Sequence, residues 1–219
     1  MEEIAKRIKP VCAGRPEQKT LKAMAPVLKN PILAPDEERI IYEVCRGASL
    51  PEDKDIIKDN NIRYDITKIH PGRLGPSTAL GVNKELPKTF GHYHIPKEAT
   101  EIFKVISGRA MFLIQKYEDN PEIIKEVYLI EAGENEKIIV PPGFGITSVN
   151  PEKTELILAN WIGREVKNDY QFYEKLRGAC YYLTENKKGE IVFEKNHNYK
   201  KVPTLVKLKS KELPEYEKI

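Results

Sequence analysis

The sequence predicts an all-β protein, an antiparallel barrel or jelly roll with short helical extensions at both ends. Its central part is a series of short apolar runs that close at glycine or proline, a pattern typical of antiparallel strands joined by turns. Two such runs, 110–117 and 123–133, are separated by the polar turn EDNPE. The chain contains no internal repeat and no low-complexity linker. Its 219 residues are therefore expected to form a single domain, 1–219, with its own core.

Residues 1–35 form a predicted N-terminal extension. The segment EEIAKRI, residues 2–8, has the pattern of a short amphipathic helix. The segment TLKAMAPVL, residues 20–28, is also apolar at helical spacing until Pro26 interrupts it. The barrel and the hairpin that follows it are expected over residues 36–200.

The first barrel strands are expected at Arg39–Val44 and at 63–70, and the second of these ends in a Pro-Gly turn. A long loop punctuated by glycine and proline follows over 72–88 and is a candidate lid. Next come an extended segment at 92–94 and a half-buried strand over 101–108. The hexapeptide IPKEAT connects them and contains a breaker, so the two segments are expected to form a hairpin.

The C-terminal part begins with DYQFYEKLRGACYYL, residues 169–183, which is predicted to be helical or irregular. An overlapping segment, CYYLTENKKGEIVFEK, has two apolar runs around a polar turn at Asn186–Gly189 and predicts a hairpin. Residues 201–219 are a charged tail, expected to be a short helix or frayed.

The composition argues against several classes of protein. The chain has 36 basic and 33 acidic residues, a net charge of +3, and its basic residues are dispersed, which argues against a nucleic-acid surface. No run of about 18 apolar residues offers a membrane span, and the first residues lack the apolar core of a signal peptide. The three cysteines, Cys12, Cys45 and Cys180, are odd in number and include no C-x-x-C. Disulfides and a structural zinc site are therefore not expected. The cysteine content instead favours a cytoplasmic location.

The run Gly91-His92-Tyr93-His94 is the most informative local feature, because a carboxylate, Glu101, follows seven residues later. In an extended segment His92 and His94 point to the same face while Tyr93 points away. Two imidazoles and one carboxylate suit Fe(II), Zn, Mn or a similar divalent ion and leave room for a substrate oxygen. A polar strand whose histidines meet solvent would show the same spacing, so spacing alone leaves both interpretations open.

The motif resembles the first cupin motif, because Gly91, His92, His94, Glu101 and Gly108 match it in order. The long step from the second histidine to the glutamate is similar to that in the cupin-type glucose-6-phosphate isomerases of archaea. So is the T-x-G-H-x-H run that begins at Thr89. Further agreements are Thr67 four residues before a Pro-Gly pair, the segment PPGFGITSVN, and an Asp-Tyr pair at 169–170. The resemblance covers about residues 30 to 200.

One departure from the family pattern concerns the fourth metal ligand. The second motif of the family runs P-P-x-x-x-H-x-x-x-N, and Ile146 stands at its histidine position. His70 is three residues from Thr67, so strand alternation sends these two side chains to opposite faces, and His197 lies in a polar C-terminal stretch. Neither is expected to replace the missing ligand.

Smaller departures lie near the expected sugar. Phe103 and Trp161 stand where the family has tyrosines, and Asn168 stands where it has a histidine. These changes leave open whether the activity of the family is altered.

The resemblance implies a cupin β-barrel and an aldose–ketose isomerase that interconverts glucose 6-phosphate and fructose 6-phosphate. It further implies a homodimer and a divalent metal, Fe, Mn, Zn or Ni, bound by His92, His94 and Glu101. Two alternatives stay open: a cupin that binds a metal or a sugar phosphate without isomerase activity, and another metal-dependent cupin enzyme such as an oxygenase.

The resemblance also implies the residues that hold the substrate. Thr67, Thr89 and the amide of Gly91 would bind the phosphate, although each threonine is also an ordinary β-branched strand residue. Glu101 and Tyr170 would be catalytic. Glu101 would serve as ligand or proton carrier, and Tyr170 would contact the sugar or else pack in the core.

Overall fold

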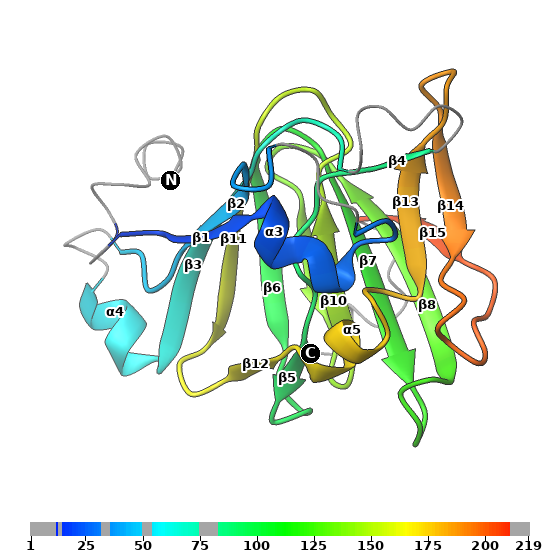
Figure 1. Ribbon diagram of the computed structural model, residues 1–219. Helices are drawn as coiled ribbons and strands as arrows, with labels where there is room; N and C mark the ends of the chain where they lie inside the picture. The colour runs from blue at the N-terminus through cyan, green and yellow to red at the C-terminus, as the bar shows by residue number, and fades with distance from the viewer. Residues whose placement is uncertain (1–11, 13–14, 32–35, 50–53, 75–82, 211–219) are drawn as a thin grey trace.

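The computed structural model describes residues 12, 15–31, 36–49, 54–74 and 83–210 (Figure 1). Two β-sheets form the body of the molecule. The larger sheet is antiparallel throughout, in the order β1 (Glu17–Thr20), β2 (Ile40–Cys45), β3 (Ile62–Ile69), β11 (Leu156–Gly163), β6 (Glu101–Ser107) and β9 (Lys137–Val140). The second sheet has the order β10 (Gly145–Val149), β7 (Ala110–Tyr117), β8 (Ile124–Ala132) and β15 (Val206–Lys209).

Smaller elements surround these two sheets. One two-stranded sheet joins β12 (Lys167–Asp169) to β5 (Tyr93–Ile95), and a three-stranded sheet has the order β14 (Ile191–Lys195), β13 (Tyr181–Glu185) and β4 (Lys84–Glu85). The helices of the described residues are short: α3 (Leu21–Met24), the 3-10 helix η1 (Ala25–Val27), α4 (Lys54–Asp59) and α5 (Gln171–Lys175). Within the described ranges no helix has the length and apolar content that crossing a membrane requires. The expected all-β jelly roll of the cupin type, with short helices, is confirmed.

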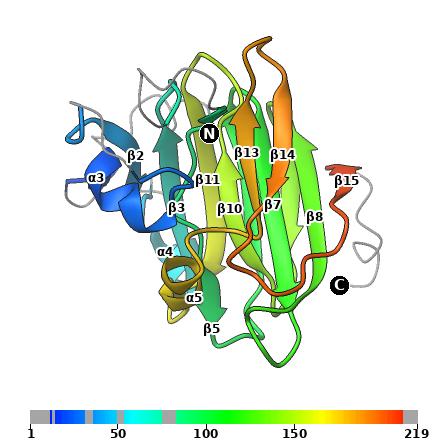
Figure 2. The ribbon, with the colours of Figure 1, turned by 45° about the vertical axis from the view of Figure 1, so that its right-hand side comes forward.

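The main hydrophobic core lies between the two sheets (Figure 2). Phe103 of β6 and Phe112 of β7 are both buried, with ring centroids 5.5 Å apart, so the two sheets are in direct contact. A smaller cluster covers the opposite face of the larger sheet and includes Tyr64 and Ile66. Because successive side chains of a strand point to opposite faces, Thr67 of the same strand faces the interior. The face of the larger sheet that points between the sheets carries the candidate site.

Most predicted strands are confirmed. The strand expected at Arg39–Val44 is β2, the one at 63–70 is β3, and the hairpin over 110–133 is β7 with β8. The C-terminal hairpin is β13 with β14, and α5 occupies the segment before it. The apolar piece 20–28 forms α3 and η1, where Thr20 caps α3 by accepting a hydrogen bond from Ala23 N.

The hairpin expected between 92–94 and 101–108 is wrong. β5 pairs with β12, whereas β6 lies between β11 and β9 in the larger sheet. Both edges of β6 are already occupied by these partners, so its backbone groups have no free edge to offer β5. The connection at 96–100 instead carries the chain from one sheet to the other.

The prediction of no disulfide is also wrong. Cys12 and Cys45 are bonded, with Cα atoms 5.7 Å apart, and Cys180 is free and buried. The count and spacing of cysteines do not encode a tertiary contact between residues 33 positions apart.

Three further expectations concern the ends and the long loop. The start of the charged tail is a strand, β15, which pairs in parallel with β8, while 211–219 lie outside the described residues. The helix expected at 2–8 lies outside them too, as does the middle of the candidate lid, 75–82. Part of the N-terminal extension, β1, is an edge strand of the larger sheet.

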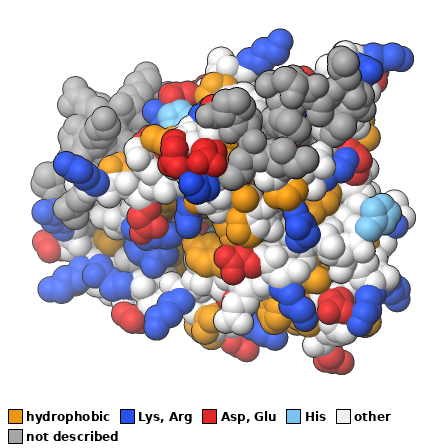
Figure 3. Space-filling view, in the orientation of Figure 1, with side chains coloured by type: hydrophobic (Ala, Val, Ile, Leu, Met, Phe, Trp, Pro, Cys, Tyr) orange, Lys and Arg blue, Asp and Glu red, His pale blue; other side chains and the backbone are white. Residues whose placement is uncertain are grey.

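On the face seen in Figure 3, basic and acidic side chains are scattered among apolar ones.

Candidate metal centre

A pocket opens on the inner face of the larger sheet and is lined by alternate residues of four adjacent strands. Thr67 of β3 pairs with Val44 of β2 on one side and with Leu158 of β11 on the other. One step along, Asn160 pairs with both Asp65 and Phe103. The lining side chains are those of Tyr42, Val44, Arg46, Arg63, Asp65, Thr67, Glu101, Phe103 and Asn160 from the larger sheet, and of Thr89, Phe90, His92, Ile146, Ser148, Asn168 and Tyr170 opposite.

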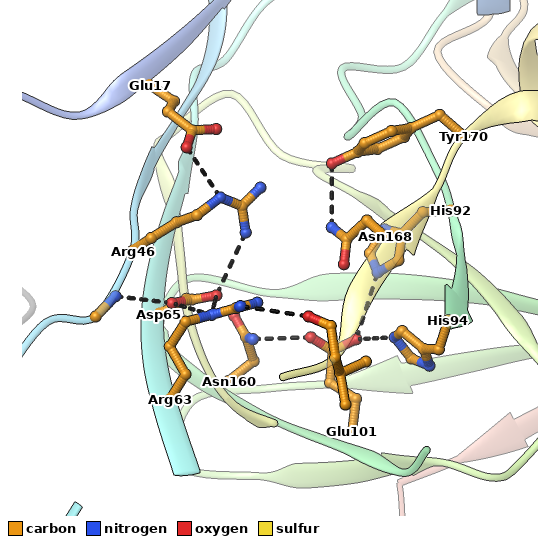
Figure 4. Close-up of polar contacts among 12 residues, drawn as sticks. Glu17, Arg46, Arg63, Asp65, His92, His94, Glu101, Asn160, Asn168 and Tyr170 are labelled. Carbon is orange, nitrogen blue, oxygen red and sulfur yellow. Dashed lines mark hydrogen bonds and ion pairs between the residues drawn. The ribbon is translucent and has the colours of Figure 1, made fainter. Parts of the chain in front are cut away.

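His92, His94 and Glu101 come together at this pocket, which His92 and Glu101 line (Figure 4). Their ligand atoms all lie within 4.8 Å of one another. His94 Nε2 is 3.1 Å from Glu101 Oε2, and His92 Nε2 is 3.6 Å from the same oxygen. The expectation that the two histidines share a face and meet the glutamate is therefore met, although Glu101 arrives from a different sheet and not from the other arm of a hairpin.

The charges of the cluster suit a cation. Burial by itself raises the pKa of Glu101, but the polar and charge interactions with the two nearby histidines outweigh it and lower the pKa to about 2. Burial also lowers the pKa of His92. At neutral pH the site therefore contains a carboxylate beside a neutral His92, which are the ligand forms that metals bind.

One observation supports the fit of these residues to a divalent metal. His92 Nε2 is buried and has no hydrogen-bond partner among the described residues, since 3.6 Å to Glu101 is too long for a hydrogen bond. A buried ring nitrogen normally has a partner. The donor set of two imidazoles and one carboxylate is one that binds Fe(II), Zn or similar ions and leaves open positions.

The residues expected to bind substrate all line the same pocket. Thr67, Thr89, Gly91 and Tyr170 belong to it together with His92 and Glu101 of the cluster. Thr89 Oγ1 accepts a hydrogen bond from Ser148 N at 3.0 Å, and its hydroxyl hydrogen is left to donate.

Gly91 has a further, packing role that the sequence did not indicate. Its φ is +88°, and a Cβ there would lie 2.4 Å from the ring of Tyr173 and 2.5 Å from Thr147 Oγ1. No larger residue fits this position without displacing its neighbours.

Tyr170 lies at the edge of the pocket and packs on its apolar neighbours at the same time. Its ring meets Phe90 edge-on at 5.5 Å and lies 6.0 Å from the ring of His92. Its hydroxyl accepts a hydrogen bond from Asn168 Nδ2 at 3.0 Å. Both readings of this residue, packing and contact with a ligand, are compatible with its position.

A family model described as glucose-6-phosphate isomerase matches residues 18–201, most of the chain. The chain belongs to the glucose-6-phosphate isomerase family. Glucose-6-phosphate isomerase of Pyrococcus abyssi is 24% identical to it over 168 residues, which cover 77% of each chain.

Solved structures with similar folds are distant. Vicilin of hazelnut, Corylus avellana, gives a TM-score of 0.42 at 11% identity and covers 58% of this chain. An oxalate oxidase gives 0.41 at 16% identity and covers 57% of this chain. The protein spans 32% of the vicilin chain and 54% of the oxidase chain.

The position where the glucose-6-phosphate isomerase family has its fourth ligand faces the cluster. Ile146 lines the pocket, is 1% exposed, and exchanges backbone hydrogen bonds with His92 in both directions, at 2.9 and 3.1 Å. Among the described residues the cluster contains no fourth ligand. His70 lies beside Glu43 and Glu155, away from the pocket. His197 lines a different, more open pocket at the C-terminal hairpin.

Of the positions where the glucose-6-phosphate isomerase family has tyrosines, only Phe103 faces the pocket. Trp161 points to the opposite face, where its ring lies 5.0 Å from Tyr64 in the outer cluster. Its neighbour Asn160 takes the inward position and donates a hydrogen bond to Glu101 Oε1 at 2.8 Å. The expectation that Trp161 lies near the sugar is therefore wrong by one residue, which reverses the face in a strand.

Sequence reasoning missed the charged side of the pocket, formed by Arg46, Arg63 and Asp65. The signal was present on β3, because Arg63 and Asp65 alternate with Thr67 and must share its face. No signal marked Arg46, which follows the last residue of β2 and enters the pocket through the pairing of β2 with β3.

Proposed function

We propose that this protein is a metal-dependent aldose–ketose isomerase that interconverts glucose 6-phosphate and fructose 6-phosphate. Membership of the glucose-6-phosphate isomerase family supports the reaction class. The observation that carries the proposal is the cluster of His92, His94 and Glu101 beside the pocket that Thr67 and Thr89 line. This arrangement supports a ligand that reaches a metal at one end and hydroxyl donors at the other.

The reaction moves a carbonyl between C1 and C2, so a proton or a hydride must cross between adjacent carbons. His92, His94 and Glu101 would hold a divalent metal, which supplies a Lewis acid for the oxygens on C1 and C2. Asn160 holds the Glu101 carboxylate in place through Oε1. Two roles are open to Glu101, ligand and proton carrier, and its low pKa keeps it ionised for either.

The other side chains fix the substrate. Thr67 and Thr89 donate hydroxyl hydrogens to the phosphate and the amide of Gly91 adds a third donor, which holds the far end of the sugar still while C1 and C2 react. Tyr170 and Asn168 close the pocket over the sugar with hydroxyl and amide groups. Phe103 and Ile146 give the wall around the reacting carbons an apolar surface that limits water.

The phosphate cradle gives a direct test. Replacing both Thr67 and Thr89 with valine keeps side-chain shape and strand propensity but removes two charge-assisted donors. We expect glucose 6-phosphate to bind on the order of a hundredfold more weakly, measured by calorimetry, with the isomerase rate at low substrate falling in proportion in a coupled assay. Thr184→Val is the matched control, because Thr184 is a buried strand threonine of β13 that does not line the pocket. Equal affinity in the double variant and the parent would remove sugar phosphate as the ligand.

A second candidate function is favoured by Ile146. An apolar side chain at the position of the fourth ligand fits a cupin that binds a metal or a sugar phosphate without isomerising it. The same coupled assay separates the candidates, since saturable binding of glucose 6-phosphate without formation of fructose 6-phosphate supports this second function.

A further inference from the structure

Arg46 brings a positive charge into the pocket that holds the metal cluster. Its Nε lies 3.0 Å from Glu17 Oε1 and its Nη1 lies 3.4 Å from Asp65 Oδ2. Among the described residues its Nη2 has no hydrogen-bond partner. Figure 4 shows this third nitrogen directed toward the side of the pocket where Tyr170 and Asn168 lie. A guanidinium group thus has donor capacity left over inside the pocket.

Asp65 does not depend on Arg46 for its neutralisation. Its two oxygens lie 2.9 and 3.1 Å from Nε of Arg63, and Gly47 N donates to Oδ1 at 2.9 Å. Arg63 and Asp65 therefore form a matched pair, and the counter-charge of Arg46 is Glu17. The side chain of Glu17 is 60% exposed, and an ion pair with such an exposed partner contributes little free energy. An anion of higher charge entering the pocket can displace it.

The strand pattern places Arg46 next to the expected phosphate donors. Tyr42 and Val44 alternate along β2, Arg46 continues the alternation directly after its last residue, and all three line the pocket. Val44 is the register partner of Thr67, so Arg46 lies one step along the same inward face. Hydroxyls and amides bring no net charge to a phosphate, whereas a guanidinium brings a full charge and a forked pair of donors that matches phosphate oxygens.

We infer that Arg46 binds the phosphate group of the substrate, and that Glu17 holds its guanidinium when no anion is bound. The phosphate takes over the Glu17 contact and engages Nη2, while Asp65 stays paired with Arg63. Glu17, a residue of the edge strand β1, thus competes with phosphate for the guanidinium of Arg46. The identity of the phosphate ester rests on the proposed function, but the chemistry of the contact requires only a phosphate. A purely structural salt bridge between β1 and β2 would contain the same two residues and is the alternative to exclude.

The two interpretations predict different effects of one substitution on phosphate affinity. If Glu17 competes with phosphate, Glu17→Gln frees Arg46 and tightens phosphate binding about two- to fivefold, the range expected for losing an exposed ion pair. Arg46→Gln weakens binding about tenfold, because a charge-assisted contact is lost. In a protein that already carries Arg46→Gln, adding Glu17→Gln leaves the phosphate affinity unchanged. Glu37→Gln is the control. It removes the exposed ion-pair partner of Lys22, neither residue lines the pocket, and the phosphate affinity is expected to stay unchanged.

The experiment measures dissociation constants of inorganic phosphate and glucose 6-phosphate by calorimetry for the full-length parent, the two single variants, the double variant and the control. Glucose serves as a neutral ligand whose binding does not respond to these changes. Arg46→Lys is measured as well: it keeps the charge without the fork, and affinity intermediate between the parent and Arg46→Gln is expected. If Arg46→Gln does not fold, the sign of the Glu17→Gln effect still decides, because unchanged or weaker phosphate binding in that variant overturns the inference.

The outcomes separate this inference from the proposed function. If the affinities for inorganic phosphate change across the variants as predicted, but the protein does not isomerise glucose 6-phosphate, the role of Arg46 is supported and the isomerase function is refuted. Isomerisation with affinities indifferent to Arg46 and Glu17 supports the isomerase and overturns the role of Arg46. A parent protein that binds neither phosphate nor glucose 6-phosphate overturns both.

Discussion

Position 146 lies beside the candidate metal ligands. The backbone of Ile146 is locked to that of His92 by two hydrogen bonds, and its side chain faces the pocket beside the cluster. A histidine at this place would add an imidazole to a donor set that already contains two imidazoles and a carboxylate. With isoleucine there, His92, His94 and Glu101 are the candidate ligands that the described residues bring together.

Ile146→His is therefore expected to tighten the binding of a divalent metal by about tenfold or more, because it adds a fourth protein ligand to a nearly preformed site. Competition with a chromophoric chelator measures the affinity for Zn or Co, and circular dichroism checks the fold. Ile146→Gln is the control, since it adds polarity without an imidazole and is expected to leave metal affinity close to that of the parent. Unchanged affinity in a folded histidine variant would mean that position 146 does not correspond to the ligand position of the family.

The segment between β4 and β5 carries Thr89, Gly91 and His92 past β10 and α5, and its course depends on one glycine. Thr89 N donates to Ser148 O and His92 N to Ile146 O, so the segment is fixed to β10 on both sides of Gly91. The ring of Tyr173, in α5, fills the space where a side chain of residue 91 would lie. The sequence motif at 89–94 is thus held in place by packing against an element about 80 residues later in the chain.

Gly91→Ala is expected to lower the free energy of unfolding by about 3 kcal/mol or more, because it combines a positive φ with a clash against the buried side chains of Tyr173 and Thr147. Gly189→Ala is the matched control: its φ is +80°, but nothing lies within 4 Å of the added Cβ, so a loss of about 1 kcal/mol is expected. Urea unfolding of both variants gives the comparison. Equal losses would show that residue 91 is not confined by Tyr173.

Strands with strong local sequence patterns could be predicted, whereas the strands that pair with them across long sequence separations could not. The alternating runs of β7 and β8 and the polar turn of the C-terminal hairpin are visible in the sequence and are found in the structure. The hairpin expected around 95–100 failed because the pairing of β6 is decided by β11, which lies more than 50 residues later. Local periodicity specifies that a segment is extended, but it does not specify which strand has a free edge.

For the whole molecule, the same distinction explains which site residues could be foreseen. His92, His94 and Glu101 form a compact motif in the sequence, so their proximity followed from spacing and resemblance. Asn160 and Arg46 enter the pocket only through the register of β11 and β2 against β3, which no local pattern encodes. The one-residue error at Trp161 has the same origin, because register decides which of two neighbours faces inward.

Removal and return of the metal test the central claim most directly. The protein is stripped of metal with a chelator, freed of the chelator, and assayed for conversion of glucose 6-phosphate to fructose 6-phosphate as Fe, Mn, Zn or Ni is added back. We expect the stripped protein to be inactive while still folded, and one of these metals to restore the rate with an end point at one ion per chain, because His92, His94 and Glu101 form a single site. Full isomerase activity in the metal-free protein, or no activity with any of these metals, would contradict the account.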